Sequence, residues 1–318
     1  AMPGECKTNI PEAHQAYTRG NSKLETGGRE DLRAALNYFQ RAVALDTSYA
    51  CAYAGLAETY TRLGILNEPI SNVVAKGREA AERALTLDST LVAAHTARAH
   101  QLFSECKWRD AEKAFERALA LDSRYALARR YYGLYLHFTR RHDAALAQLH
   151  SARNLDPRLP GAETLLGRVF VNTSQPDSAI RYLQEALVFK ESLAYAYQQL
   201  AHAYLQKRMH TAAVESMQRA AELSGARDSA QLAYIYAATG NPAEARRIVQ
   251  RLVDTESQRD LPAPAMAMAY AGLGDADEAF RWLDKTPCAS GLAVTAGFES
   301  IRSDPRFDVL LRRIGLLP

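Results

Sequence analysis

Several functional classes are excluded by what this 318-residue sequence does not contain. No apolar run approaches the roughly 20 residues that a membrane-spanning helix needs. The net charge of +3 is too small, and the charges are too scattered, to indicate nucleic-acid binding. The four cysteines form no CxxC pair, so neither a disulfide framework nor a structural zinc site is expected. Small buried thiols at Cys51 and Cys106 and a reducing compartment are the expectation instead.

Catalytic and ligand-binding motifs are also missing. No HExxH or GxSxG motif occurs, and no cysteine has an identifiable base partner. The Gly-Leu-Gly run at 272–274 looks like the start of a dinucleotide fingerprint, but without a third glycine it is better interpreted as an inter-helix turn. Asp275, Asp277 and Glu278 lack the spacing of a calcium loop and suit the first turn of a helix. We therefore expect a chain that is not an enzyme and uses neither a metal ion nor a cofactor.

What the sequence does contain is a repeat of 34 residues. A short leucine–aspartate signature ends a helical pattern at Asp88 and recurs at Asp122 and Asp156, and Lys190 occupies the same place one repeat later. An earlier copy, at Asp46, lies 42 residues upstream of Asp88. A fixed period of this length is typical of solenoid proteins, in which each repeat packs against its neighbours.

Each repeat contains two helical patterns joined by a glycine or polar turn. The first carries large apolar residues three and four positions apart, and the second places small residues on either side of a large one. Both are helical periodicities rather than strand alternation. An alanine at a crossing point lets two helix axes approach to about 8–10 Å. The first pattern is seen at Tyr53, Leu56, Ala57 and Tyr60, and the second at Ala111, Phe115 and Ala118.

Residues at these positions resemble the tetratricopeptide repeat, from about Glu12 to Leu283. The resemblance implies an all-α fold: a right-handed α-solenoid of antiparallel helix pairs, with about seven to eight repeats and a C-terminal capping helix. In such an array each unit buries its apolar face only against its neighbours.

The domain organisation follows from this register. Residues 1–11 are expected to be a leader, and residues 12–318 a single solenoid. Within it, 12–253 would form repeats one to seven, and 254–318 the last repeat and the capping helix. Asp304 is the expected N-cap of that helix. The apolar face of the capping helix comprises Phe307, Leu310, Leu311 and Ile314.

In tetratricopeptide arrays the first helix of each pair lines a concave groove, and the resemblance assigns residues of this chain to it. Aromatic side chains supply contact area at low entropic cost, and amides can satisfy a peptide backbone. Such a surface suits an extended peptide or a partner helix. The assigned residues are His100, Phe103, Arg130, Tyr131, Leu134, His137, Phe138, Arg168, Asn172, Tyr195, Gln198, Gln199, His202 and Gln206.

Two interpretations fit these residues. Either they line a groove that binds a partner, or their aromatic rings pack across a tight superhelix and fill it. If they line a groove, alanine at Tyr131 and Phe138 weakens partner binding and leaves the melting temperature nearly unchanged. Three of the assigned residues are histidines, His100, His137 and His202. They are expected in the groove or at the surface, in repeats too far apart for them to share one metal ion.

The ending FESIRSDPRFDVLLRRIGLLP and the segments AYTRGNSKL and ALNYFQRAVALDTSYACAYAGLAETYTRLG resemble the C-terminal arrays of certain bacterial signalling proteins. These are winged-helix transcriptional regulators, adenylate cyclases and receptor-type kinases. The resemblance implies a non-catalytic interaction scaffold, acting as the regulatory module of a signalling or transcription-regulating protein. The alternative is a small-molecule-sensing domain of a one-component regulator.

The effector domain of those proteins lies upstream of the array and is not found in this chain, which is therefore either a trimmed piece or an adaptor. The expected partner is a protein or peptide, with no direct nucleic-acid binding and no membrane binding. A homo-oligomer is compatible with the sequence. We expect a cytoplasmic location, with a periplasmic sensory domain as the alternative.

Overall fold

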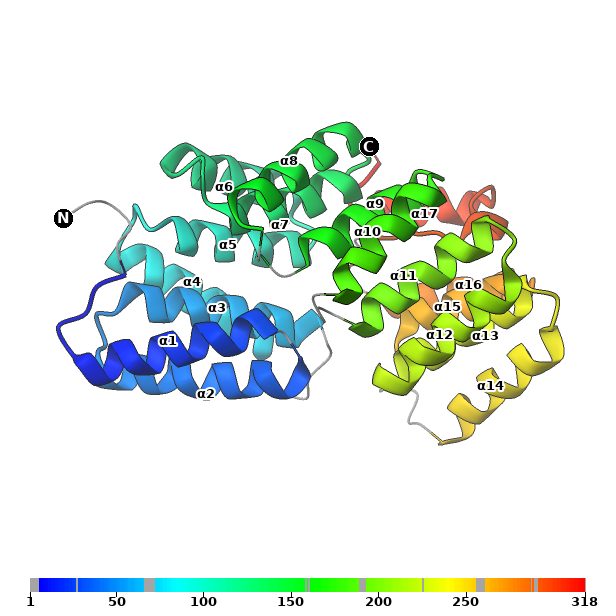
Figure 1. Ribbon diagram of the computed structural model, residues 1–318, viewed down its shortest axis with the longest axis horizontal. Helices are drawn as coiled ribbons and strands as arrows, with labels where there is room; N and C mark the ends of the chain where they lie inside the picture. The colour runs from blue at the N-terminus through cyan, green and yellow to red at the C-terminus, as the bar shows by residue number, and fades with distance from the viewer. Residues whose placement is uncertain are drawn as a thin grey trace. The chain divides into compact units, whose positions relative to one another are not determined.

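The computed structural model describes residues 6–26, 28–65, 72–157, 159, 161–188, 193–224, 226–255, 261–286, 288 and 291–317. In this part of the chain the regular structure is entirely helical, with helices α1–α17, one 3-10 turn (η1) and no strand (Figure 1). The expected all-α class is confirmed. None of the described helices combines the length and the apolar character needed to cross a bilayer.

The chain divides into two compact units. Unit 1 comprises residues 1–135 and 147–160, and unit 2 comprises residues 136–146 and 161–318. The single solenoid expected over residues 12–318 therefore stays a prediction. The helices of unit 1 are α1 (Pro11–Thr26), α2 (Arg29–Leu45), α3 (Ala50–Ile65), α4 (Val73–Leu87), α5 (Val92–Ser104) and α6 (Trp108–Leu121), while α7 (Ala126–Phe138) and α8 (His142–Leu155) contribute residues to both units.

Unit 2 contains the remaining helices. They are α9 (Ala162–Asn172), α10 (Pro176–Val188), α11 (Leu193–Gln206), α12 (His210–Ser224), α13 (Ala226–Ala238), α14 (Pro242–Thr255), α15 (Ala263–Gly272), α16 (Ala276–Leu283) and α17 (Pro305–Arg313), with η1 at Glu299–Ile301.

Successive helices are arranged as pairs, in which we call the odd-numbered member the first helix and the even-numbered member the second helix. Within unit 1, α1 contacts α2, α3 contacts α4 and α5 contacts α6; within unit 2 the same holds from α9 with α10 to α15 with α16. First helices also contact one another, as α3 does α5 and α13 does α15. These contacts define three pairs in unit 1 and four in unit 2, a number that agrees with the seven to eight repeats expected.

The aspartates of the 34-residue signature end the second helices. The backbone N–H groups of Asp46, Asp88 and Asp122 donate to alanine carbonyls four residues earlier. Each of these aspartate side chains accepts a hydrogen bond from the backbone N–H two residues later. The carboxylate therefore closes an Asx turn, which ends one helix and leads into the next. Lys190, at the corresponding place in a later repeat, lies outside the described residues.

The turns within the pairs share a second local feature, a residue with positive φ followed by a residue whose N–H donates to a carbonyl five positions earlier. This is the Schellman ending of a helix, a conformation that favours glycine. Most of these turns nevertheless have a residue other than glycine at that position. The residues with positive φ are Cys106 (57°), Arg140 (63°), Ser174 (57°), Arg208 (58°), Gly240 (90°) and Gly274 (80°).

Small residues allow close packing of the helix pairs, as the periodicity predicts. Ala111, Phe115 and Ala118 of α6 are fully buried. At Gly167 of α9, an added Cβ would lie 2.5 Å from Cγ of Leu183 in α10, so a larger residue could not be accommodated without movement. The small–large–small spacing is therefore the contact surface between helices.

The C-terminal helix α17 is confirmed as a cap on the last pair. The Asp304 side chain accepts a hydrogen bond from the backbone N–H of Arg306, and so acts as the N-cap. Nη1 of Arg306 lies 2.7 Å from Asp277, and Nη1 of Arg313 lies 2.8 Å from Asp284, so α17 lies along α16. The buried face of the cap consists of Phe307, Leu310, Leu311 and Ile314.

The expectation for the cysteines was wrong. Cys6 and Cys51 form a disulfide, with their Cα atoms 5.5 Å apart, and Cys106 is not a free thiol either. Their spacing in sequence could not reveal the pairing, because it depends on the contact of α1 with α3, which brings the segment before α1 against the start of α3. The reducing compartment inferred from the absence of CxxC pairs loses its basis.

Candidate functional site on the first helices

Three successive first helices of unit 1 are joined by a buried polar cluster. Glu58 of α3 accepts a hydrogen bond from Nδ1 of His100 in α5 at 2.9 Å and another from the hydroxyl of Tyr131 in α7. The rings of His100 and Tyr131 are stacked, with centroids 4.0 Å apart. All three side chains are buried. Because an ionised carboxylate only accepts hydrogen bonds, Nδ1 of His100 must carry the hydrogen.

The pKa of Glu58 shows which effect dominates in this cluster. Burial by itself raises the pKa of the carboxyl group, but His100, Arg62 and the Tyr131 hydroxyl together outweigh burial and lower it to about 2. Burial, followed by the neighbouring Glu58 charge, raises the pKa of Tyr131. The cluster is therefore a carboxylate whose two oxygens both have donors from other helices. Such an arrangement fixes the helices relative to one another and leaves little for a ligand to bind.

Other side chains of unit 1 approach the same cluster. The pKa of Tyr125, just before α7, is raised mainly by burial, with Tyr17 of α1 the next cause. The guanidinium of Arg130 lies 4.3 Å from the centroid of the Tyr131 ring. In unit 1 the first helices are thus packed together by their own side chains.

The aromatic residues around α7 are accounted for by packing. Tyr135 meets Phe103 edge-on with centroids 6.0 Å apart, and Tyr132 stacks on Phe115 at 5.5 Å. The hydroxyl of Tyr135 donates to the carbonyl of Trp108 at 3.1 Å. Offset and edge-on pairs stabilise a core beyond the burial of their surface alone. The concentration of rings therefore does not by itself indicate a ligand.

In unit 2 the last turn of α7 is joined to α9 through His137. Nε2 of His137 accepts a hydrogen bond from Nδ2 of Asn172 at 2.9 Å, and its Nδ1 lies 3.0 Å from Nδ1 of His142. Burial, with the nearby Arg168 and His142, lowers the pKa of His137 to about 2. The imidazole is therefore neutral, and the amide donor at Nε2 leaves the hydrogen on Nδ1.

Arg168 of α9 is the most unusual side chain of this region. Its guanidinium carbon lies 4.4 Å from the centroid of Phe138 and 5.8 Å from that of Tyr195, so it bridges the end of α7 and the start of α11. Within the described residues it has neither a hydrogen-bond acceptor nor an ion-pair partner. A partly buried cation is usually paired, so this group is available to a carboxylate or carbonyl oxygen from elsewhere.

Residues 291–301, which we call the inner segment, lie on the first helices of unit 2. The backbone N–H of Ala296 donates to Oδ1 of Asn172 at 3.3 Å, and the hydroxyl of Ser300 donates to the carbonyl of Ala271 at 3.0 Å. An added Cβ at Gly291 would lie 3.1 Å from Nη2 of Arg168. The segment is anchored by buried apolar side chains, namely Leu292, Val294, Phe298 and Ile301.

Polar groups of α11 and α13 lie near the end of the inner segment. Burial lowers the pKa of His202, and the nearby Gln231 amide and the charge of Glu299 oppose this effect. The rings of His202 and Tyr234 lie 5.7 Å apart. Oε1 of Gln231 is buried and has no hydrogen-bond partner among the described residues, and the same is true of Oγ1 of Thr164 in α9.

The residues assigned to the groove from sequence fall into three groups by exposure. Arg130, Leu134, Arg168, Asn172 and Tyr195 are partly exposed, and Gln206 is exposed. The buried group contains His100, Phe103, Tyr131, His137, Phe138, Gln198, Gln199 and His202.

The structure brings some of these residues together and separates others. Five belong to unit 1 and nine to unit 2. Direct contacts join His137 to Asn172 and place Arg168 between Phe138 and Tyr195. The exposed fractions of Tyr131 and Phe138 are only 5% and 6%. These values favour the interpretation in which the rings fill the interior, and the three histidines are buried rather than at the surface.

Sequence reasoning missed two features of this region. Glu58 stands among the apolar residues of the first-helix pattern, and an acid in that position is a signal that could have been noticed. The inner segment carries no periodicity, so no pattern could place it on α9 and α15. We call the side of unit 2 on which it lies the first-helix face, defined by Arg168, Asn172 and His202, with Tyr195 beside Arg168.

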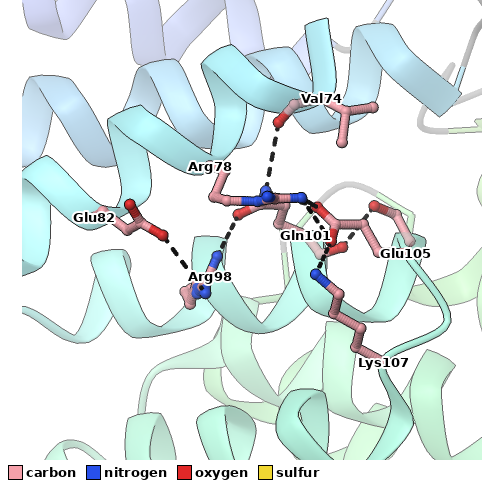
Figure 2. Close-up of polar contacts among 8 residues, drawn as sticks. Val74, Arg78, Glu82, Arg98, Gln101, Glu105 and Lys107 are labelled. Carbon is pink, nitrogen blue, oxygen red and sulfur yellow. Dashed lines mark hydrogen bonds and ion pairs between the residues drawn. The ribbon is translucent and has the colours of Figure 1, made fainter.

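A second polar network lies between α4 and α5, and its charged groups are paired with one another (Figure 2). Figure 2 shows Glu105 at its centre, with Nη2 of Arg78 at 3.2 Å and Nζ of Lys107 at 2.5 Å. Nε2 of Gln101 donates to Glu105 at 2.9 Å, and Oε1 of Gln101 accepts from Arg98. Burial favours a higher pKa for Glu105, but the two cations lower it. Because its donors and acceptors satisfy one another, this network is structural.

A surface cleft of about 680 Å³ lies between α14 and the turn from α15 to α16. Arg246, Tyr270, Asp275 and Asp277 line it. The Asp275 carboxylate caps α16 by accepting from the backbone N–H of Glu278, as its place in the sequence predicts. Asp277 is paired with Arg306 of α17. The carboxylates of this cleft therefore have structural partners within the protein, one as a helix cap and one in an ion pair.

Comparison with known protein families identifies tetratricopeptide repeats in two segments, residues 96–160 and residues 194–227. The first spans α5 to α8, and the second spans α11 and α12. The resemblance inferred from the 34-residue period is confirmed for these segments. A comparison with curated protein sequences found no match.

Solved structures of similar fold include several tetratricopeptide-like solenoids. Pseudomonas aeruginosa pilF superposes with a TM-score of 0.50 and 23% identity, covering 66% of this chain and 94% of that one. A human IFIT1 dimer with m7Gppp-AAAA gives a TM-score of 0.61 and 18% identity, covering 86% and 71%. Yeast Tom70 gives 0.55 and 16%, covering 98% and 70%. At these identities the likeness establishes the helical-repeat fold alone.

Proposed function

We propose that this chain is a non-catalytic interaction scaffold that binds a segment of a partner protein on the first-helix face of unit 2. The observation that carries the proposal is Arg168, a partly exposed guanidinium that lies 4.4 Å from the Phe138 ring centroid and 5.8 Å from that of Tyr195, without an acceptor among the described residues. The rings hold the cation in place, so a partner oxygen would meet a preorganised donor. The tetratricopeptide segments support a role in protein interaction.

The finer proposal is that the scaffold is the regulatory module of a bacterial signalling or transcription-regulating protein. It is supported by the resemblance of residues 298–318 to the ends of such arrays. A partner captured by the chain would then itself carry, or be bound to, an effector domain. Finding only partners without such domains would remove this part of the proposal.

Affinity capture with matched variants tests the scaffold function. Arg168→Ala is expected to lose the partner proteins that the unaltered chain captures. Arg181→Ala is the control, because Arg181 also stacks on an aromatic ring, that of Tyr182 at 4.4 Å, but lies on the second helix α10. Equal recovery of the same partners with both variants would move the binding surface away from Arg168. Circular dichroism of both variants checks that the helices are retained.

The alternative function is a small-molecule sensor, and one observation favours it. Thr164 and Gln231 each have a buried polar atom with no partner among the described residues, and such atoms are often satisfied by a ligand or ordered water. A molecule that binds only the folded chain must raise its melting temperature. A panel of small polar compounds that leaves the melting temperature unchanged would count against this alternative.

We also propose that the chain works in an oxidising compartment. The Cys6–Cys51 disulfide supports this location, because such bonds persist outside the reducing cytosol. Alkylation of free thiols immediately after lysis, followed by mass spectrometry, tests it. Modification of Cys6 and Cys51 in the freshly isolated protein would restore the cytoplasmic location.

A further inference from the structure

The inner segment contacts a series of first helices rather than a single neighbour. It reaches α9 through Asn172 and α15 through Ala271, at opposite ends of unit 2's run of first helices. Between them, Glu299 lies close enough to His202 of α11 and Tyr234 of α13 to influence the pKa of both. A helix of the repeat would contact its own pair and the next, whereas this segment contacts both the first and the last of the first helices of unit 2.

The contacts of the inner segment are those of a bound peptide. It is irregular apart from the single turn η1. A backbone N–H meets a side-chain amide of the scaffold, and apolar side chains fill the positions between the polar contacts. Peptides bound in grooves use backbone hydrogen bonds for affinity and alternate side chains for specificity.

One end of the segment does not match the surface beneath it. Gly291 lies against Arg168 and has no side chain, so among the described residues the inner segment offers this cation no side-chain acceptor at this position. At the other end Glu299 stands near His202 and Tyr234, where an acid has polar neighbours. An occupant with a second acid at the Gly291 position would therefore gain a charge-assisted hydrogen bond that the resident segment cannot make.

We propose that the first-helix face of unit 2 is a peptide-binding surface, that residues 291–301 are its resident occupant, and that a partner's extended segment exchanges with them. The partner segment has small and apolar residues like those of the inner segment, with an acidic residue facing Arg168. This inference rests on the proposed scaffold function and names its partner's chemistry. Exchange does not leave the first-helix face exposed to solvent, because the incoming segment replaces the apolar contacts and the hydrogen bond to Asn172 as they are lost.

Substitution of two glycines gives a matched pair of variants, one that displaces the inner segment and one that leaves it in place. Gly297 has φ of 107°, and an added Cβ would lie 2.7 Å from Sδ of Met268 in α15. Gly240 also has a positive φ, 90°, but an added Cβ would meet nothing within 4 Å. Gly297→Val therefore strains the backbone and pushes the segment away from α15. Gly240→Val introduces similar strain at a turn outside the segment.

The experiment measures binding of a fluorescent peptide, GLAVTAGFESIR, to the full chain by anisotropy. We expect Gly297→Val to bind at least about tenfold more tightly than the unaltered chain or Gly240→Val. The same peptide with aspartate in place of its first glycine is expected to bind about tenfold more tightly again, through one charge-assisted hydrogen bond. That further gain should vanish when Arg168→Ala is added to Gly297→Val.

Several outcomes would overturn the proposal. Absence of peptide binding to every variant would make the inner segment a permanent part of the core, and equal binding to all variants would place the peptide elsewhere. An aspartate peptide with no advantage would remove Arg168 from the partner's chemistry. Dimers of Gly297→Val without peptide binding, seen by light scattering, would make a second copy the occupant. A chain that captures partner proteins but binds no peptide would keep the scaffold function and lose this inference.

Discussion

Nδ1 of His100 donates a hydrogen bond to Glu58 at 2.9 Å across 42 positions of sequence. The bond joins α5 to α3, and the Tyr131 hydroxyl joins the same carboxylate to α7. A buried, ionised carboxylate is stable only while its donors remain in place. Unit 1 is therefore held together by a polar contact in addition to its apolar core, and that contact should be visible in stability measurements.

The stability of the chain should depend on pH through Glu58. Its pKa falls from 4.5 to about 2 on folding, so the unfolded chain takes up the proton first as the pH falls. Stabilisation from this group is complete above about pH 4.5 and is lost between about pH 4.5 and pH 2, with a full size of about 3 kcal/mol. Urea unfolding across this range, compared with Glu58→Gln, isolates the contribution. Parallel pH profiles for the two proteins would contradict it.

Removing only the hydroxyl of Tyr131 should destabilise the chain. Tyr131→Phe leaves one oxygen of a buried carboxylate without its donor, at a cost of about 1–3 kcal/mol. Tyr132→Phe is the control: Tyr132 is partly exposed and its hydroxyl bonds to Glu112 at 3.3 Å, so its loss should cost less. Chemical denaturation measures both. A Tyr131→Phe variant as stable as the unaltered chain would mean that the hydroxyl does not contribute.

Alanine at Tyr131 and Phe138 should lower the melting temperature substantially, contrary to the effect expected for groove residues. Both side chains are buried, and truncation of a buried aromatic ring typically costs about 3–5 kcal/mol. Differential scanning calorimetry of each single variant measures the effect. An unchanged melting temperature with weaker partner binding would instead restore the groove interpretation for these two rings.

The Cys6–Cys51 disulfide should contribute about 2–4 kcal/mol, because it closes a loop of 45 residues in the unfolded chain. The double variant Cys6→Ser/Cys51→Ser, studied without reductant, measures that contribution by chemical denaturation. Thr8→Val is the nearby control and removes two hydrogen bonds, one donated to Asp46 and one accepted from the backbone N–H of Ile10, each worth about 1 kcal/mol. Equal losses for the two proteins would show that the crosslink adds nothing beyond local contacts.

The positive-φ turns predict opposite effects for two substitutions. Gly240→Ala should destabilise the chain by about 1 kcal/mol, because an alanine in the left-handed region is strained and nothing lies near the added Cβ to complicate the result. Ser174→Gly, at the equivalent turn with φ of 57°, should be neutral or stabilising by up to about 1 kcal/mol. Thermal unfolding of both checks the pair. The same sign for both would show that φ does not govern these turns.

The local features of this protein could be predicted from its sequence. The helix pairs, the aspartate turns and the capping helix at Asp304 depend on residues within a few positions of one another. Their physical causes are apolar periodicity, an acceptor side chain at a helix end and a proline or glycine at a boundary. The 34-residue period then implies stacking of the pairs, because one pair cannot bury its apolar face alone.

The chemistry of the first helices was decided only by the tertiary structure. Whether Tyr131 lines a groove or fills an interior depends on how closely successive first helices approach, and no single repeat encodes that distance. The Cys6–Cys51 bond, the hydrogen bond from His100 to Glu58 and the hydrogen bond from Ala296 to Asn172 all join residues more than 40 positions apart. Such contacts form only when the helices pack together, because packing brings residues that are distant in sequence within bonding distance. Which polar or apolar group each side chain then contacts depends on that packing.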